Sequence, residues 1–349
     1  MSATAAALLP ISIVIPTRNS MDKLPDHLRR HREVFTHCAE IVHCDSYSQD
    51  DTKSFLAADL AAHPNLRQID HPPGLYESWN HALQQCTQPF IYISTVGDRI
   101  DLDALKHLLT LATETDADVV ISPPRFEDEA GRAQDDLRWP LHQLIATHTI
   151  AADGLVPPAV VFTEAVLLAP DGMLGSAASG LFRASFLKPR PFPPGFHGVS
   201  DSAWALTHLP EARCAIIPQP ISTFLLHPKS YESHGVLNAR IAVLIRSLLR
   251  KELRRRLQSA SSPPSLASPA PLPPALLKSL RDFNLVALLR ARHHFKLVSL
   301  RKKWRAFWFF HPGAWIARRH RARYQRLARD LAARVRSDLA RLGASASSS

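Results

Sequence analysis

Cysteine is scarce in this sequence, and long hydrophobic runs are absent. The four cysteines, at positions 38, 44, 86 and 214, do not form the CxxC pairs of metal-binding or redox motifs. No apolar run reaches the ~18 residues of a membrane-spanning helix, and the N-terminal residues lack the basic segment and long apolar run of a signal peptide. These absences exclude a disulfide framework and predict buried free thiols in the reducing environment of the cytoplasm.

Acidic residues are scarce in one part of the chain only. From residue 231 onward the sequence holds 25 Lys and Arg against 5 Asp and Glu, whereas the first 230 residues hold 17 and 26. The net charge of +11 therefore predicts a protein of two parts, with a first domain over 1–230 and a basic, mostly helical extension over 231–349. A Pro/Ser-rich stretch at 258–274 predicts a flexible linker inside the extension.

Short apolar runs alternate with helical patterns along the first domain. The sequence predicts strands over 11–15, 40–44, 66–69, 90–95, 118–122 and 215–224, and helices over 20–35, 53–62 and 75–86, from 103 and from 202. Asn19 or Ser20 is expected to cap the first helix, and Leu75 to lie on the buried face of the third. Strand and helix in turn predict right-handed βαβ units and an α/β fold with a parallel sheet, whereas 123–175 has no readable period.

Acidic side chains follow two of the expected strands. Asp45 comes directly after the strand over 40–44, and Asp98 follows the strand over 90–95 and a glycine at 97. Ligands of open α/β sheets bind at the carboxyl ends of the strands, so we expect a nucleotide pocket beside Asp98. Asp101 and Asp103, further along, are expected to cap the next helix instead.

Three motifs between residues 11 and 100 stand in a defined order. Residues 13–19 read IVIPTRN, Asp45 is followed by SQDDT at 48–52, and residues 74–80 read GLYESWN. In this order they resemble the nucleotide-binding half of a family 2 glycosyltransferase. The resemblance implies the GT-A fold, a Rossmann-like and mostly parallel sheet flanked by helices. It also implies an enzyme that transfers a sugar from a nucleotide diphosphate sugar.

The resemblance also implies roles for individual residues. Pro16 and Thr17 would hold the base against the backbone, and Asp45 would accept a hydrogen bond from the base or ribose. The residues implied in nucleotide binding are Pro16, Thr17, Asn19, Asp45, Ser48, Asp50, Tyr76 and Asn80.

The metal site departs from the family pattern. Two acids are usual after the fourth strand, but Gly97 stands where one of them is common, so only Asp98 is left. Asp98 could hold Mn²⁺ or Mg²⁺ with help from phosphates, water and His227, which resembles a strand-end histidine of the fold. Alternatively, Arg99 or another cation replaces part of the metal's charge, or the protein is degenerate and inactive.

The acceptor side is implied by a second motif. Asp201 followed by Trp204 resembles the family's catalytic acid and its tryptophan, and Gly180 and Arg183 lie in a segment that resembles the acceptor loop. An inverting transfer needs a carboxylate that takes the proton of the acceptor hydroxyl, and we assign this role to Asp201. The alternative is that Asp201 only caps the helix that follows.

These observations lead to one main hypothesis and one rival. The main hypothesis is an inverting glycosyltransferase of polysaccharide biosynthesis that acts on a saccharide or lipid-linked acceptor. The rival is a non-catalytic nucleotide-sugar-binding or scaffold protein. The basic extension suits an anionic membrane surface at the cytoplasmic face of the membrane, nonspecific nucleic-acid binding or a solvated appendage, and the membrane is favoured over nucleic acid.

Overall fold

The computed structural model describes residues 8–174, 176–226, 235–260, 272–303 and 312–346. The chain forms two compact units. Unit 1 consists of 1–156, 173–204 and 212–228, and unit 2 of 157–172, 205–211 and 229–349. Unit 2 thus includes two short segments of the first 230 residues, and the domain boundary at 230 stays a prediction.

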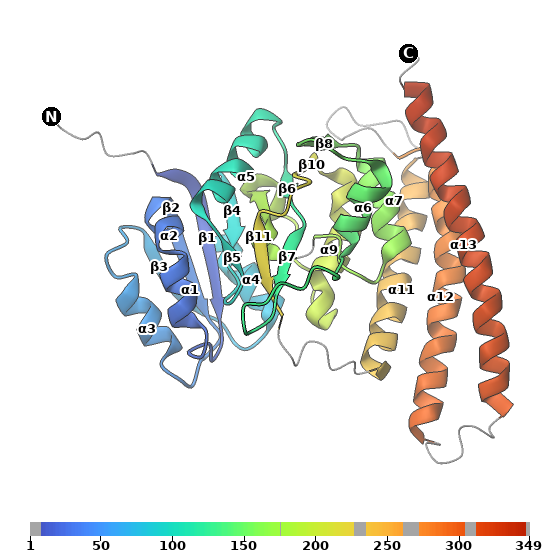
Figure 1. Ribbon diagram of the computed structural model, residues 1–349, viewed down its shortest axis with the longest axis horizontal. Coiled ribbons are helices and arrows are strands. Elements are labelled where there is room, and N and C mark those ends of the chain that lie inside the picture. Colours follow the sequence, from blue (N-terminus) through green and yellow to red (C-terminus); the bar gives the residue numbers. More distant parts are fainter. Residues whose placement is uncertain (1–7, 175, 227–234, 261–271, 304–311, 347–349) are drawn as a thin grey trace. The chain divides into compact units, whose positions relative to one another are not determined.

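Unit 1 contains all the strands of the described chain and most of its short helices (Figure 1). The strands are β1 (Leu9–Thr17), β2 (Cys38–Asp45), β3 (Leu66–Asp70), β4 (Phe90–Ile93), β5 (Arg99–Ile100), β6 (Val119–Ile121), β7 (Pro124–Glu127), β8 (Gly154–Val156), β9 (Gly180–Arg183), β10 (Cys214–Ile216) and β11 (Ser222–Leu225). The helices are α1 (Leu24–Arg30), α2 (Arg32–His37), α3 (Thr52–Asp59), α4 (Leu75–Gln85), α5 (Leu102–Glu114), α6 (Pro140–His148), η1 (Ala177–Ser179), α8 (Ala184–Leu187), η2 (His197–Val199) and the first half of α9 (Ser200–His208).

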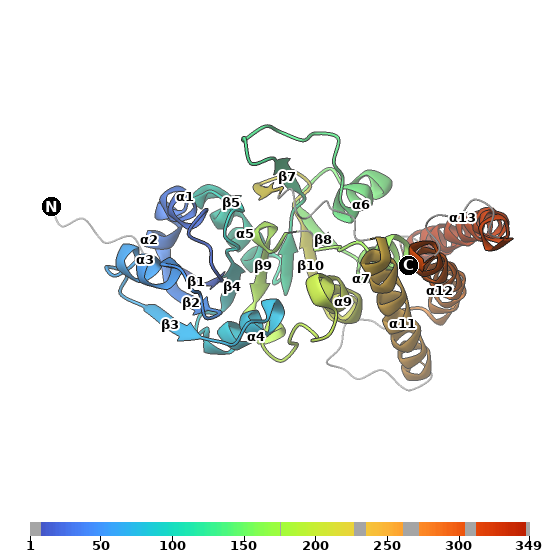
Figure 2. The same ribbon diagram turned by 90° about the horizontal axis from the view of Figure 1, so that it is seen from below.

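The described strands form two sheets. Eight of them make one sheet in the order β3-β2-β1-β4-β9-β6-β10-β8, and β5, β11 and β7 make a second (Figure 2). The first four strands of the large sheet are mutually parallel, whereas β9 runs antiparallel to both of its neighbours. Thr17 lies opposite Asp45 across β1 and β2, so the polar residues at these carboxyl ends share one edge of the sheet. The predicted α/β fold with a mostly parallel sheet is confirmed.

The centre of this sheet is buried on both faces. Ile11, Ile13 and Ile15 of β1 are fully buried, as a continuous apolar run in a central parallel strand should be. Each such side chain stabilises the fold by about 1.5–3 kcal/mol. Asp101 caps α5 by accepting a hydrogen bond from the N–H of Ala104 at 2.7 Å, as predicted.

Three details of the predicted elements are wrong. The expected helix over 20–35 is two helices, α1 and α2, which meet at His31, and its N-cap is Lys23 without a side-chain cap. Leu75 is 54% exposed because it is the first residue of α4 and precedes the buried stripe. The expected strand over 215–224 is β10 in the large sheet and β11 in the small one, because two prolines between them interrupt the pairing.

Unit 2 is helical. It contains α7 (Pro158–Leu168), η3 (Leu209–Glu211), α11 (Gly235–Ser259), α12 (Pro274–Lys303) and α13 (Pro312–Ala346). The last three helices lie side by side in both views, and the predicted basic helical extension is confirmed (Figures 1 and 2). Among the described helices, none combines the length and apolar composition that a membrane crossing requires. Residues 261–271 of the expected linker lie outside the described residues.

Candidate functional site

A chain of hydrogen bonds joins the carboxyl ends of β1 and β2. Thr17 donates to Asp45 Oδ1 at 2.9 Å, so its hydroxyl accepts from His43 Nε2, 2.8 Å away. Burial lowers the pKa of His43 to about 4, although Asp45 acts in the opposite direction, and the ring is neutral at pH 7. Gln68 donates to the other ring nitrogen. The predicted residues Thr17 and Asp45 therefore belong to one ordered network.

The loop after β2 folds back on Asp45. The N–H of Ser48 donates to Asp45 Oδ2 at 2.8 Å and its hydroxyl to Oδ1 at 2.6 Å, and Asp45 is only 2% exposed. Ser48 in turn accepts from the N–H of Asn19, whose side-chain oxygen accepts from the N–H of Gln49. Asn19 therefore fastens one loop to the other instead of capping α1. In this geometry, the carboxylate of Asp45 shapes both loops.

Asp50 and Thr52, like Ser48, accept hydrogen bonds from backbone N–H groups of the loop after β1. Asp50 Oδ2 accepts from the N–H of Met21 at 3.3 Å, and the hydroxyl of Thr52 accepts from the N–H of Ser20 at 2.7 Å. The spacing of the SQDDT motif thus has a physical reason, because alternate side chains hold successive backbone amides of the loop after β1.

Tyr47 is a residue that the sequence motifs do not single out. It lies between Asp45 and Ser48 with φ of 54°, in the left-handed region that few non-glycine residues adopt. Its ring is 52% exposed. An exposed aromatic side chain held in a strained loop is a candidate ligand contact.

Tyr76 and Asp201 come together from distant parts of the sequence. The phenol of Tyr76 donates to the carbonyl oxygen of Gly198 at 3.4 Å, and it lies close enough to the carboxyl of Asp201 to affect the pKa of that group. Burial raises the pKa of Asp201, while hydrogen bonds from Ser202 and Tyr76 lower it. Asp201 lies in the first turn of α9 and accepts from the N–H of Ser202 at 2.7 Å. The geometry thus brings together a residue of the third motif and the predicted base.

Asn80 and Trp204 hold the chain segment that precedes Asp201. The amide of Asn80 donates to the carbonyl of Phe192 at 2.8 Å and accepts from its N–H at 2.9 Å. Trp204 is fully buried beside Phe192 and donates to the carbonyl of Arg190 at 2.6 Å. Both side chains therefore hold the segment that leads into α9.

Asp98 lies at the centre of three segments. Its Oδ2 accepts from the hydroxyls of Thr95 and Ser176, both at 2.6 Å, and its Oδ1 accepts from the N–H of Leu225 at 3.1 Å. The residue is 6% exposed. Asp98 thus joins the loop after β4 to η1 and β11, and neither Ser176 nor Leu225 was recognisable as a partner from the sequence.

Gly97 has a backbone that other residues rarely adopt. Its φ is 109°, which a side chain would strain, so an acid cannot take this position without distorting the loop. The N–H of Gly97 donates to Nδ1 of His27, 3.4 Å away, and His27 Nε2 is 3.0 Å from the hydroxyl of Ser94. The glycine at position 97, where the family motif often has an acid, therefore goes with a loop conformation that an acidic residue would strain.

The described residues do not fit a metal site made by the protein. They contain no cluster of three His, Cys, Asp or Glu that could hold an ion, and both oxygens of Asp98 accept hydrogen bonds from protein donors. His227 lies outside the described residues. Arg99, the alternative cation, donates to Glu127 at 2.6 Å. We derive no step of the reaction through a metal.

Gly180 and Arg183 belong to β9. Gly180 is buried against Ile121, whereas Arg183 pairs with Phe90 at the amino end of β4 and donates to Asp116 at 2.8 Å. The structure therefore does not bring Arg183 to the carboxyl-end site of the sheet.

Comparison with known proteins gives a family match for one segment of the chain and a similar fold. Residues 12–155 match the model of the family described as Glycosyl transferase family 2. No curated protein matches this sequence. TarS of S. aureus has a similar structure, with a TM-score of 0.51 at 17% identity over 82% of this chain and 44% of TarS. The mannosyltransferase PcManGT from Pyrobaculum calidifontis has a TM-score of 0.51 at 15% identity, over 95% of this chain and 86% of its own. This chain spans less than half the length of the full TarS chain.

Proposed function

Because residues 12–155 match the model of glycosyl transferase family 2 and unit 1 has the GT-A fold, we propose that this protein is an inverting glycosyltransferase. It transfers a sugar from a nucleotide diphosphate sugar to a saccharide or lipid-linked acceptor. The observation that carries the proposal is the contact between Tyr76 and Asp201, since it joins the nucleotide motifs to a carboxyl group suited to base catalysis. Structures of similar proteins are consistent with the donor class. TarS has been solved in complex with UDP-GlcNAc, and PcManGT in complex with GDP-Man and Mn²⁺.

The nucleotide binds at the loops after β1 and β2 in this proposal. The network of Thr17, Asp45 and Ser48 fixes these loops, and Asn19 fastens one to the other. The base then lies against their backbone, with the ring of Tyr47 available for stacking. Pro16 and Asp50 contribute by setting the shape of the first loop, and Asn80 by positioning the segment at Phe192.

Asp201 is the base of the proposed reaction. Its carboxylate accepts the proton of the acceptor hydroxyl while that oxygen forms a bond to the anomeric carbon. The bond from this carbon to the diphosphate breaks on the opposite face, and the nucleoside diphosphate leaves with the electron pair. Burial raises the pKa of Asp201, which makes the carboxylate a stronger base than an ordinary aspartate. That a divalent cation binds together with the diphosphate stays a prediction.

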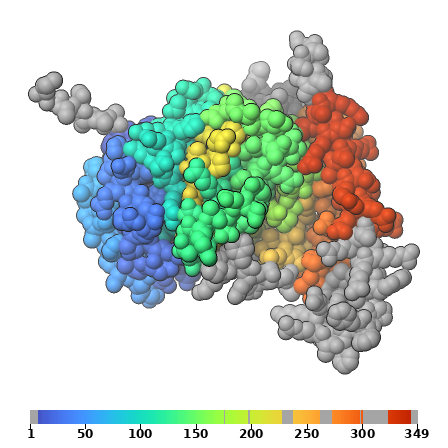
Figure 3. Space-filling view, viewed as in Figure 1, coloured from blue at the N-terminus to red at the C-terminus, as the bar shows by residue number. Residues whose placement is uncertain are grey.

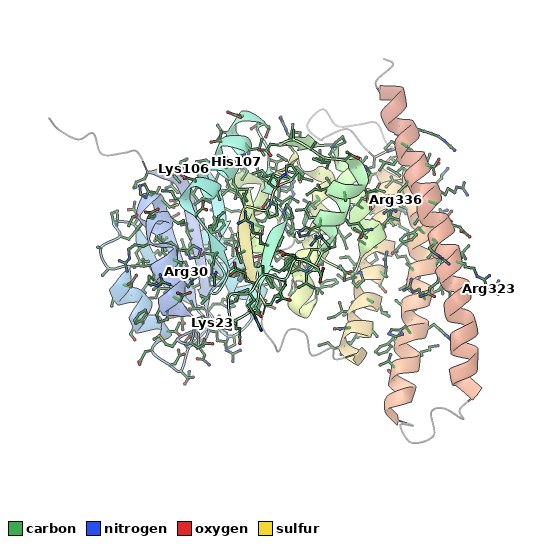
Figure 4. All side chains as sticks on the ribbon, viewed as in Figure 1. Lys23, Arg30, Lys106, His107, Arg323 and Arg336 are labelled. Carbon is green, nitrogen blue, oxygen red and sulfur yellow. The ribbon has the colours of Figure 1, made fainter. Side chains whose placement is uncertain are left out.

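The proposal also includes the surface of α13. Arg323, Arg326, Arg329 and Arg334 are exposed on its described part, and Arg323 points away from the helices in Figure 4. The described part of α13 is open to the surface in Figure 3. A dense set of arginines attracts an anionic membrane surface, where a lipid-linked acceptor would be found.

The release of nucleoside diphosphate tests the catalytic proposal. The full chain is incubated with UDP-GlcNAc, UDP-glucose and GDP-mannose, together with small saccharide acceptors. Asp201→Asn should slow release by about 10²- to 10⁴-fold, the usual contribution of a general base. Asp103→Asn, a change on the surface of α5, is the matched control and should keep the wild-type rate. Equal rates for wild type and Asp201→Asn would reject Asp201 as the base.

A further inference from the structure

Unit 2 contains a pocket that the proposed transfer reaction does not use. It has a volume of about 450 Å³ and lies between the segment that ends α7 and the helices α11, α12 and α13. This volume falls within the range of about 300–1,000 Å³ that small-molecule sites span. Its lining comes from four separate elements of one compact unit, so the pocket depends on how unit 2 folds and not on unit 1.

The first notable feature of the pocket is a buried cation. Arg246 of α11 is only 6% exposed, and its guanidinium donates to the carbonyls of Val166, at 2.7 Å, and Ala169. It also lies 5.4 Å from the centroid of the Phe283 ring. No carboxylate of the described chain forms an ion pair with it. A buried charge that is solvated only by dipoles and a ring is costly without a counter-charge.

The second feature is a further positive charge beside the first. Arg290 of α12 lines the same pocket, and it makes no hydrogen bond or ion pair with any described residue. Burial, together with Arg290, lowers the pKa of Arg246 to about 10, although Asp171 acts in the opposite direction. Asp171 is the one carboxylate in the lining, and burial raises its pKa although Arg246 acts in the opposite direction. Two arginines against one partly desolvated carboxyl leave the pocket with an excess of positive charge.

Part of the remaining wall is apolar, whereas polar groups elsewhere in the lining come from His293, His294 and Tyr324. Phe283, Ala287 and Ala291 line it from one face of α12, and Leu167 and Pro170 from the end of α7. The side chains of this apolar part carry no hydrogen-bonding groups. They would exclude water around a hydrocarbon group instead.

We infer that this pocket binds an organic phosphate whose organic part is apolar. The phosphate oxygens accept hydrogen bonds from the guanidinium groups of Arg246 and Arg290, a geometry that arginine favours. The hydrocarbon part contacts the wall formed by Phe283 and Ala287. The ligand thereby adds a negative charge to that of Asp171, which acts on Arg246 without forming an ion pair with it.

Calorimetric titration of the full chain tests this inference with three probes. Hexyl phosphate carries both features of the ligand, inorganic phosphate only the charge, and hexanol only the hydrocarbon. Hexyl phosphate should bind at least about tenfold more tightly than either of the others, since a charged hydrogen bond and a buried chain each contribute more than a tenfold step. Equal binding of hexyl phosphate and hexanol would overturn the inference, and so would equal binding of hexyl phosphate and inorganic phosphate.

Two variants locate the binding in this pocket. Arg290→Gln removes an exposed charge that the fold does not need, and it should weaken hexyl phosphate binding at least about tenfold. Arg292→Gln is the matched control, because this exposed arginine lies on the same helix but outside the lining. Ala287→Leu fills the pocket and should also weaken binding. If Arg290→Gln and Arg292→Gln bind like wild type, the site is not this pocket.

Discussion

At the scale of single residues, Tyr47 in the loop after β2 combines a strained backbone with an exposed ring. An L-residue in the left-handed region costs roughly 1–2 kcal/mol, yet the exposed ring gains no burial in return. We therefore expect Tyr47→Gly to leave the stability of the fold unchanged or slightly raised, because glycine relieves the strain. If the ring stacks on the base of the donor, the same change should weaken nucleotide affinity by about 1–3 kcal/mol.

Two measurements check this expectation together. Thermal unfolding reports the stability, and calorimetric titration with nucleoside diphosphates reports the affinity. Tyr47→Phe keeps the ring and is the matched control, so it should bind as wild type does. Wild-type affinity in Tyr47→Gly would contradict a stacking role.

The hydrogen bond from Tyr76 predicts a change in pH dependence. Burial raises the pKa of Asp201, and the bond from Tyr76 opposes that effect. A base must be ionised, so the rate should rise with pH through the pKa of Asp201. Tyr76→Phe removes a bond that favours the carboxylate, so the acidic limb of the kcat/KM profile should move to higher pH. A limb that stays in place would show that the two groups do not interact during the reaction.

At the scale of single residues, the motifs singled out Thr17, Asp45 and Ser48 but not the contacts among them. These side chains meet because the loops after β1 and β2 lie next to each other. The contact between Tyr76 and Asp201 spans the whole of unit 1 and became visible only in the structure. The left-handed backbone of Gly97 explains its departure from the family pattern, and nothing in the composition around it reveals that angle.

At the scale of elements, an ion pair joins α13 to α7 within unit 2. Arg336, labelled in Figure 4, donates to both carboxylate oxygens of Glu164 at 2.8 and 3.0 Å. Glu164 is fully buried, whereas the side chain of Arg336 is 37% exposed. This asymmetry predicts unequal effects. Arg336→Gln should destabilise the protein by about 3–5 kcal/mol, since it takes the charged donors from a buried carboxylate. Glu164→Gln should cost less, because Arg336 can turn to water.

Chemical denaturation of the two variants measures this difference. Arg341→Gln breaks an exposed pair with Asp338 and is the control, with an expected cost below about 1 kcal/mol. A larger loss in Glu164→Gln than in Arg336→Gln would contradict the account of this pair.

Helices and strands with long, regular apolar patterns were easier to predict from the sequence than short strands. β1, β2 and α5 have clear apolar periods and were predicted within a few residues. The region 123–175 was not, because β7 and β8 are short strands whose partners lie far away in the sequence. The same long-range pairing placed β11 beside β5 and brought Leu225 to Asp98, which no local pattern encodes.

At the scale of the whole molecule, the uneven charge predicts how the protein meets a membrane. The full chain should bind vesicles that contain anionic lipid and release them as salt rises, because the attraction of arginines to the surface is screened. Neutral vesicles should not bind. Cosedimentation with both kinds of vesicle is the measurement, and Arg323→Glu combined with Arg326→Glu should weaken it. Equal binding to neutral vesicles, or tighter binding to DNA at the same salt, would contradict the membrane proposal.

The change in charge near residue 230 lies close to Gly235, the first residue of α11. It did not predict that 157–172 and 205–211 belong to unit 2, since those segments have the composition of the first domain.

Nucleotide binding tests the central claim most directly. Thermal unfolding of the full chain is measured with UDP, GDP, dTDP and CMP, each with and without Mn²⁺. The account predicts that one nucleoside diphosphate stabilises the fold by about 2.7 kcal/mol at a hundred times its dissociation constant, and that Asp45→Asn removes the effect. A shift that requires Mn²⁺ would add a cation to the donor complex. No shift with any nucleotide would contradict the claim that the loops after β1 and β2 form a donor site.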